Sequence, residues 1–220
     1  MSVTGEPARQ PQKVGVAVTD IFTGIYVATA ILAAVHQRAT TGEGQHIDMA
    51  LLDVATSIMA NQAMNYLASG TPPQRMGNAH PNIVPYSVFD CDDGWIIVAT
   101  GNDGQYRRLC QVLGLDDLAE APAYLTNADR IANRVALTEK ITAKTRAWSK
   151  ADLLAACEAA GVPAGPINDM GEVFADPQIV ARGMRVDLGG VPGVRSPFTF
   201  SGAELALAHP SPKLGEHDES

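Results

Sequence analysis

Residues 86–100 read Tyr-Ser-Val-Phe-Asp-Cys-Asp-Asp-Gly-Trp-Ile-Ile-Val-Ala-Thr, and this stretch predicts a β-hairpin. Two apolar runs, 86–90 and 95–100, flank an Asp-Gly pair that tolerates the positive φ angles of a tight turn. Helical periodicity follows the hairpin at 103–113, 128–148 and 151–160. Capping-box patterns at Thr126 and Ser149 open the last two helices. We therefore expect a small α/β domain over residues 86–168.

Two strand–helix units are predicted upstream: a strand at 14–19 with a helix at 23–38, and a strand at 45–50 with a helix at 52–67. The helix 23–38 is apolar on most of its faces, so we expect it to lie in a core. Its longest apolar stretch, 25–35, is far shorter than the ~20 residues that cross a bilayer. Two such units indicate an α/β layer over residues 1–70, and the proline-rich segment 71–85 indicates a linker loop.

Short elements are predicted in the last part of the chain. They are an extended segment at 162–167, helical turns at 171–175 and 178–181, and strands at 184–188 and 194–200. We expect residues 169–208 to return towards a large α/β domain, of which residues 1–70 are a part. Prolines and closely spaced charges predict a mobile tail over residues 209–220.

The composition argues against several classes of partner. Lys and Arg number 16 against 24 Asp and Glu, which gives a net charge of -8. Binding to nucleic acid or to an anionic membrane requires clustered positive charge, so we expect neither partner. The spacing of Cys91, Cys110 and Cys157 matches no metal site and predicts buried thiols in a reducing compartment. Because the first residues lack a signal-peptide pattern, we expect a cytoplasmic protein.

Asp20 lies where the predicted strand 14–19 passes into the helix that follows. In open α/β sheets, ligands bind in the crevice at the carboxyl ends of the strands. The Asp20 carboxylate would therefore face such a crevice. A helix cap is the other role that this position favours, and the residues alone leave both roles open.

Five motifs occur in a fixed order along nearly the whole chain. They are Lys13–Gly24, Thr41–Asp53, Gly77–Tyr86, Gly101–Asn102 and Gly161–Asn168. Together they resemble the class III CoA-transferases, the formyl-CoA and carnitine CoA-transferase family of CaiB/BaiF type. The chain lacks the run of consecutive glycines of the formyl-CoA branch, so its pattern is more similar to the succinyl-CoA-dependent branch that uses dicarboxylates. The resemblance covers only the middle and C-terminal part of that family.

The resemblance implies a fold and an activity. The fold is α/β, with a remnant of a Rossmann-like large domain plus a smaller α/β domain that holds the hairpin and helices. The activity is CoA transfer (EC 2.8.3 type), with Asp20 as the covalent nucleophile that forms an anhydride and then an aspartyl-CoA thioester. CoA enters as part of the substrate, and no permanently bound cofactor or metal is implied.

Four further candidates come from Gly-Asn pairs. Gly77 and Asn78, and likewise Gly101 and Asn102, are expected to line the substrate and CoA site. Glycine lets a backbone amide approach a ligand closely, and the Asn side chain donates from its amide. Ordinary turn chemistry is the alternative role, most of all at Gly101 and Asn102.

Two side chains of the linker loop are the remaining candidates. His80 is positioned to donate a hydrogen bond to a substrate carbonyl or to CoA, and a structural hydrogen-bonding role is its alternative. Arg75 is the candidate to pair with the second carboxylate of a dicarboxylic acyl group, because a planar guanidinium suits bidentate recognition.

Two other functions stay open. The resemblance extends to α-methylacyl-CoA racemases, which pair a comparable aspartate with an upstream histidine, but no histidine precedes Asp20 in this chain. The second is an inactive truncated fragment or partner subunit, because members of the resembled family are much longer. We then expect the isolated chain to associate strongly and to need an N-terminal half for activity. The full-length family implies a homodimer.

Overall fold

The computed structural model describes residues 1–207 and 209–218. It divides into two compact units, Met1–Gly165 and Pro166–Ser220, and each is described by itself. Two predicted segments include residues outside the described part of the chain. Residue 208 of the segment 169–208 and residues 219–220 of the tail 209–220 are not described. The predicted segment boundaries at 70, 85 and 168 stay predictions.

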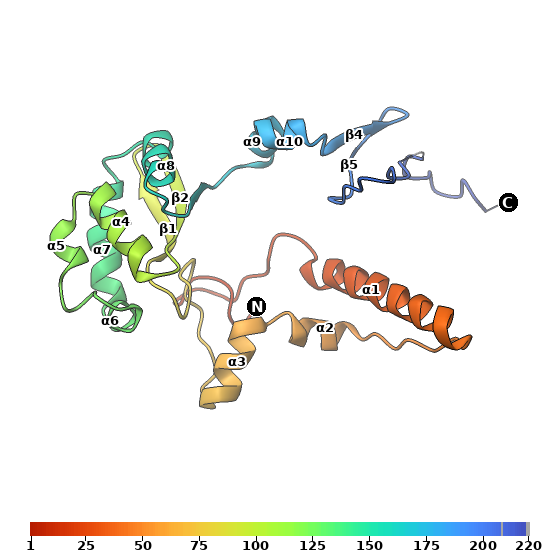
Figure 1. The fold of residues 1–220 in the computed structure, drawn as a ribbon, viewed down its shortest axis with the longest axis horizontal. Helices are drawn as coiled ribbons and strands as arrows, with labels where there is room; N and C mark the ends of the chain where they lie inside the picture. The colour runs from red at the N-terminus through yellow and green to blue at the C-terminus, as the bar shows by residue number, and fades with distance from the viewer. Residues whose placement is uncertain (208, 219–220) are drawn as a thin grey trace. The chain divides into compact units, whose positions relative to one another are not determined.

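The predicted hairpin is confirmed and lies in the first unit. Strand β1 (Tyr86–Cys91) pairs antiparallel with β2 (Gly94–Ala99), and β3 (Ala164–Pro166) follows β2 in the sheet. Alternate residues face the core, so that Phe89, Ile96 and Val98 are almost fully buried. Helix α7 (Arg134–Thr145) contacts β1 and helix α8 (Lys150–Ala159) contacts β2, as Figure 1 shows. We call residues 84–165 the hairpin core.

Three further helices complete the hairpin core: α4 (Asp103–Val112), α5 (Asp116–Ala119) and α6 (Asn127–Ala132). The predicted single helix 128–148 is wrong, because α6 and α7 are separated at Asn133. There the Asn133 side chain donates to the carbonyls of Ala123 and Asp129, which offers the backbone an alternative to helix continuation. The Thr126 capping box is confirmed, and the Ser149 hydroxyl accepts from the amide of Asp152.

A buried arginine holds several of these elements together. The Arg130 guanidinium donates to the carbonyls of Val84, Tyr124 and Leu125, and to the Asp103 carboxylate at 2.7 Å. It also lies over the ring of Tyr106, 4.5 Å from the centroid. A buried charge is tolerated only where it is paired and hydrogen-bonded, and these contacts meet that condition.

The first 70 residues form helices α1 (Val18–Thr41), α2 (Leu51–Ser57) and α3 (Ala60–Ser69). The predicted strands 14–19 and 45–50 are wrong: α1 already begins at Val18, and 45–50 joins no sheet among the described residues. A strand needs a hydrogen-bonded neighbour, which local sequence cannot guarantee. The predicted helix 52–67 is interrupted where Ala60 has φ 44°.

The environment of α1 also differs from the prediction. No residue of this helix is buried, and Ile25 and Leu32 are 57% and 70% exposed, so the expected core position is not realised in this chain. The whole helix is long and apolar enough to cross a membrane, by length and composition only, although its apolar stretch 25–35 is too short by itself. Core helices of soluble proteins meet the same criterion.

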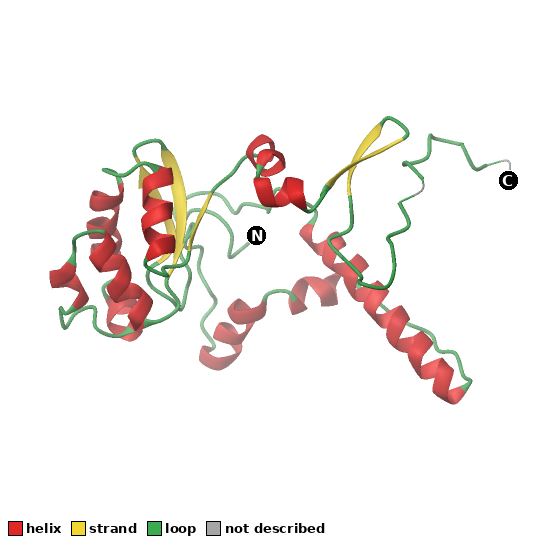
Figure 2. Ribbon diagram, turned by 45° about the horizontal axis from the view of Figure 1, so that its top comes forward, coloured by secondary structure: helices red, strands yellow, loops and turns green. Residues whose placement is uncertain are grey.

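The second unit contains α9 (Met170–Ala175), α10 (Pro177–Ala181) and a hairpin of β4 (Arg185–Leu188) with β5 (Val191–Val194), seen in Figure 2. Both helical turns and the strand at 184–188 are confirmed. The predicted strand 194–200 is wrong, because the chain reverses earlier. Gly189 and Gly190 have φ 63° and 84°, which suits a two-residue hairpin turn. Beyond it, the Arg195 side chain donates to the carbonyls of Ser196 and Phe198.

Helices and small antiparallel sheets thus occur together in the chain, and the predicted α/β class is confirmed.

Candidate functional site

Asp20 lies in the first turn of α1 and is exposed to solvent. It lines a cleft of about 470 Å³ whose walls come from residues 12–19, from Met1 and Thr4, and from Ala55, Ile58 and Met59. Lys13 brings a positive charge to the same cleft. Unpaired amides give the first turn of a helix a partial positive charge, which stabilises a carboxylate there.

The alternative role of Asp20 as a helix cap receives no support from the hydrogen bonds. The residue at the cap position is Ala17, and no side-chain capping hydrogen bond is made there. Residue 20 lies within the helix rather than at its boundary. The geometry therefore leaves an exposed carboxylate in a cleft, at the positive end of a 24-residue helix.

The backbone of Gly77 and the guanidinium of Arg75 both contact the N-terminal segment. The Gly77 amide donates to the Gly5 carbonyl at 3.1 Å. The Arg75 guanidinium donates to the carbonyls of Glu6, Pro7 and Arg9 over 3.3, 3.3 and 2.9 Å. Arg75 thus binds backbone in this structure. The neighbouring Asn78 is exposed.

His80 is half-buried and held on two sides. Its ring stacks on Tyr86 with centroids 5.1 Å apart, and its Nδ1 accepts from the Asn82 amide at 3.1 Å. Burial, and then the positive charge of Arg134, lower the pKa of His80 below its ordinary value. An acceptor at Nδ1 places the single proton of the neutral ring on Nε2. His80 can therefore donate a hydrogen bond without carrying charge.

Gly101 and Asn102 form the start of helix α4. The Gly101 amide donates to Gln105 Oε1 at 2.6 Å, and Asn102 Oδ1 accepts from the Gln105 amide at 2.9 Å. These are the hydrogen bonds of a helix cap. Gln105 was missed by the sequence analysis, although an Asn followed three residues later by Gln is a recognisable capping pattern.

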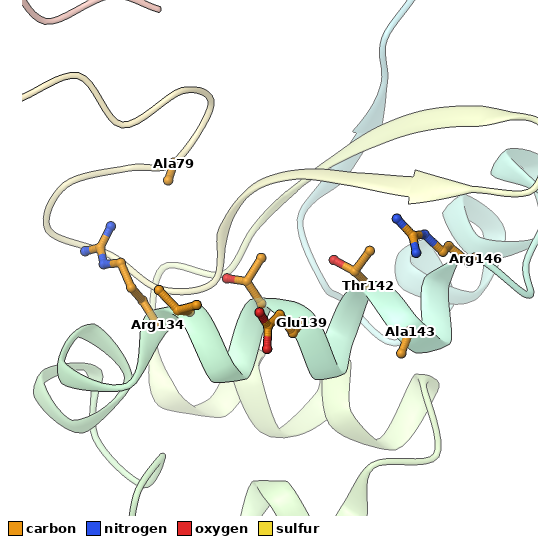
Figure 3. A pocket seen from close by; sticks show the side chains of 8 residues that line it. Ala79, Arg134, Glu139, Thr142, Ala143 and Arg146 are labelled. Atoms are coloured by element: carbon orange, nitrogen blue, oxygen red, sulfur yellow. The ribbon is translucent and has the colours of Figure 1, made fainter. Parts of the chain in front are cut away.

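A separate cleft of about 470 Å³ runs along α7 beneath the loop that carries Ala79, as Figure 3 shows. Arg134 lies near one end and Arg146 near the other, with Thr142 and Glu139 between them. Arg134 donates to the carbonyls of His80 and Pro81, and Arg146 pairs with Asp90 at 2.7 Å. Both charges are therefore engaged in holding loops and strands.

The predicted site residues fall into three places. The cleft of Asp20 is lined by none of the other candidates; Arg75, Gly77 and His80 lie on the linker loop, and Gly101 and Asn102 cap α4. Thr4 and Gln12 also line the cleft, although no local pattern in the sequence marks them. Among residues 1–207 and 209–218, no group of three or more His, Cys, Asp or Glu could hold a metal ion.

Comparison with known proteins adds an independent finding. The sequence model of a family described as CoA-transferase family III matches residues 1–218. The chain is 57% identical over 222 aligned positions to a succinate–glutarate CoA-transferase of Agrobacterium fabrum, covering 99% of this chain and 56% of that protein. It is 36% identical to the human succinyl-CoA:glutarate CoA-transferase, covering 99% of this chain and 51% of that protein.

A solved structure shows the same likeness. A CAIB/BAIF family protein from Brucella suis superposes with a TM-score of 0.82 at 56% identity, over 100% of this chain and 58% of that one. The chain thus spans about half the length of the relatives it matches.

Proposed function

This chain belongs to CoA-transferase family III, and we propose that it moves CoA between an acyl-CoA, succinyl-CoA or a similar donor, and a carboxylic acid. The relatives named above support this choice, since their names specify succinate, succinyl-CoA and glutarate as substrates. They are transferases, which favours this reaction over the racemase alternative. CoA takes part as a piece of the substrate.

We propose that Asp20 is the nucleophile. Its carboxylate oxygen attacks the thioester carbonyl, the C–S bond breaks, and CoA leaves as a thiolate. The thiolate then attacks the aspartyl carbonyl of the resulting anhydride, which releases the donor's carboxylate and leaves CoA on Asp20 as a thioester. The acceptor carboxylate repeats these steps in reverse order, so that a new acyl-CoA leaves and Asp20 is regenerated.

Three features of the described residues support this role. The Asp20 carboxylate is exposed in a cleft, as a nucleophile must be. Lys13, in the same cleft, would attract anionic substrates and CoA phosphates. The first turn of α1 offers a partial positive charge near the oxyanions that form during acyl transfer. The exposure of Asp20 in this cleft is the observation that carries the proposal.

His80, Gly77, Asn78, Gly101 and Asn102 are proposed as supporting residues. His80 suits hydrogen bonding to a substrate carbonyl, because it is neutral and its Nε2 carries the proton. The Gly-Asn pairs would contribute donors if the ligand displaces their present partners, Gly5 and Gln105.

The test is the trapping of the covalent intermediate. The chain is incubated with succinyl-CoA, treated with hydroxylamine, and residue 20 is examined by mass spectrometry for the hydroxamate. We expect the wild type to be labelled and Asp20→Asn to be unlabelled. Asp53→Asn is the matched control, because Asp53 is likewise exposed in the first turn of a helix, α2. Absence of label in the wild type, or label retained in Asp20→Asn, contradicts the proposal.

We also propose that the protein acts in the cytoplasm as a homodimer, in which α1 is covered by other protein surface of the assembly. The exposed side chains Ile21, Ile25 and Leu32 support a buried environment in the assembly. Light scattering of the purified chain tests this assembly, and vesicle flotation tests the membrane alternative. A monomer in solution, or a chain that floats with vesicles, contradicts the proposal.

A further inference from the structure

The N-terminal strap, residues 4–9, is joined to the linker loop by hydrogen bonds to the backbone carbonyls of the strap. Four hydrogen bonds join the two segments: three from the Arg75 guanidinium to carbonyls of the strap, and one from the Gly77 amide to the Gly5 carbonyl. The guanidinium fork is suited to this task because it donates in several directions at once. Residues about 70 positions apart are thereby joined.

Gly77 is fitted closely to the strap. Its φ of 59° lies in the left-handed region that favours glycine. A Cβ atom at this position would lie 2.7 Å from Glu6 Oε1 and 3.0 Å from Glu6 Oε2. A side chain at residue 77 would therefore displace the exposed, flexible end of Glu6 and would be strained in this left-handed backbone conformation.

The strap also forms part of the wall of the Asp20 cleft. Thr4, at the start of the strap, and Gln12, just beyond its end, both line this cleft. The Gln12 amide donates to the Thr4 carbonyl at 3.0 Å, so the start of the strap is joined at the wall to the residue that follows the strap. From Gln12 the chain continues along the cleft to Asp20. A displacement of the strap therefore changes the surface that faces the nucleophile.

We propose that Arg75 is a positioning residue, which fixes the strap and through it the wall of the Asp20 cleft. This role differs from recognition of a substrate's second carboxylate, because the guanidinium is already engaged by three backbone carbonyls. The inference rests on the proposed function for its catalytic consequence. Its structural part stands on the strap alone.

Limited proteolysis tests the structural part without any need for activity. Trypsin cleaves after Arg9, which lies in the strap and is exposed. For Arg75→Gln and for Gly77→Ala we expect cleavage after Arg9 to be about tenfold faster, since the first change removes guanidinium contacts that oppose local opening and the second strains the left-handed backbone that presents the residue 77 amide to Gly5. Arg107→Gln is the matched control, because Arg107 lies on the surface of α4, away from the strap contacts, and should leave the rate unchanged. Equal cleavage rates in all four proteins would overturn the proposal.

The first half-reaction tests the catalytic part. Formation of the Asp20 thioester is measured without an acceptor, from succinyl-CoA and from butyryl-CoA, which lacks the second carboxylate. We expect Arg75→Gln and Gly77→Ala to slow both donors by a similar factor. If Arg75→Gln raises the KM for succinyl-CoA alone and Gly77→Ala has no effect, Arg75 binds the carboxylate and the proposal is wrong.

These measurements separate the possible failures. If the wild type forms no thioester, the proposed function fails, while the proteolysis still decides whether Arg75 holds the strap. Folding of each variant is checked by the fluorescence of Trp95 and Trp148, both of which lie in the hairpin core. Should Arg75→Gln fail to fold, Arg75→Lys retains the charge without the fork, and faster cleavage after Arg9 is still expected. An unchanged rate in that variant counts against the proposal.

Discussion

Replacement of Arg130 by methionine is expected to destabilise the hairpin core by about 3–5 kcal/mol, the cost typical of removing one partner from a buried charged network. The Arg130 side chain is only 1% exposed. Its guanidinium satisfies three backbone carbonyls and one carboxylate, and it lies over the Tyr106 ring. Methionine refills part of the volume but donates no hydrogen bond.

The individual contributions agree with that total. A buried carbonyl left without a donor costs about 1–3 kcal/mol, and Val84 is buried. Loss of the cation–π contact removes roughly 1–2 kcal/mol in a desolvated setting. The ion pair adds less, because the Asp103 carboxylate is 45% exposed and can be hydrated when its partner is removed.

Thermal unfolding followed by tryptophan fluorescence provides the assay, because Trp95 and Trp148 both report on the hairpin core. For a chain of this size, 1 kcal/mol corresponds to about 2–4 °C, so we expect the Tm to fall by roughly 6–20 °C. The matched control is Arg107→Met, whose side chain is 46% exposed and lies 3.7 Å from Glu120. That variant should lose less than about 1 kcal/mol. Equal Tm values for the two variants would refute the reasoning.

Three further predictions concern single side chains. Burial raises the pKa of Cys157 to about 11, so its thiol should react slowly with a disulfide reagent at pH 8 until denaturant is added. Rapid reaction of Cys157 in the folded chain contradicts this. The NMR titration midpoint of His80 should lie below its ordinary value of 6.5. Protonation of His80 then favours the unfolded chain. The contribution of His80 to stability is therefore complete above pH 6.5 and declines as the pH falls through the lowered pKa. A titration midpoint above 6.5 would contradict this prediction. Ser149→Ala should cost about 1 kcal/mol in urea unfolding by removing the α8 cap, whereas an unchanged midpoint shows that the cap is dispensable.

The hairpin and the helix caps could be predicted from the sequence because their causes are local. Asp92 and Asp93 form the turn between β1 and β2, Gly94 follows it with φ 142°, and alternation selects the buried side chains Phe89, Ile96 and Val98. The caps at Thr126 and Ser149 require only residues three positions apart. Each of these features depends on neighbours along the chain.

The same local signals failed where a distant partner decides the outcome. The runs 14–19 and 45–50 carry strand-like residues, but no sheet forms with them among the described residues. A strand forms its hydrogen bonds with another segment of the chain, and a few residues of local sequence do not show whether such a segment will lie beside them. The interruption between α6 and α7 at Asn133 depends likewise on the carbonyl of Ala123, ten residues earlier.

By itself, the sequence determined the α/β class, the hairpin, and a motif order that indicated the family and placed a carboxylate at residue 20. Only the tertiary structure decided that Asp20 shares its cleft with Thr4 and Gln12, and that Arg75 binds the strap. The physical reason lies in the range of the interactions. Periodicity and turn chemistry act over a few residues, whereas hydrogen bonds between segments about 70 positions apart depend on how the chain folds back on itself.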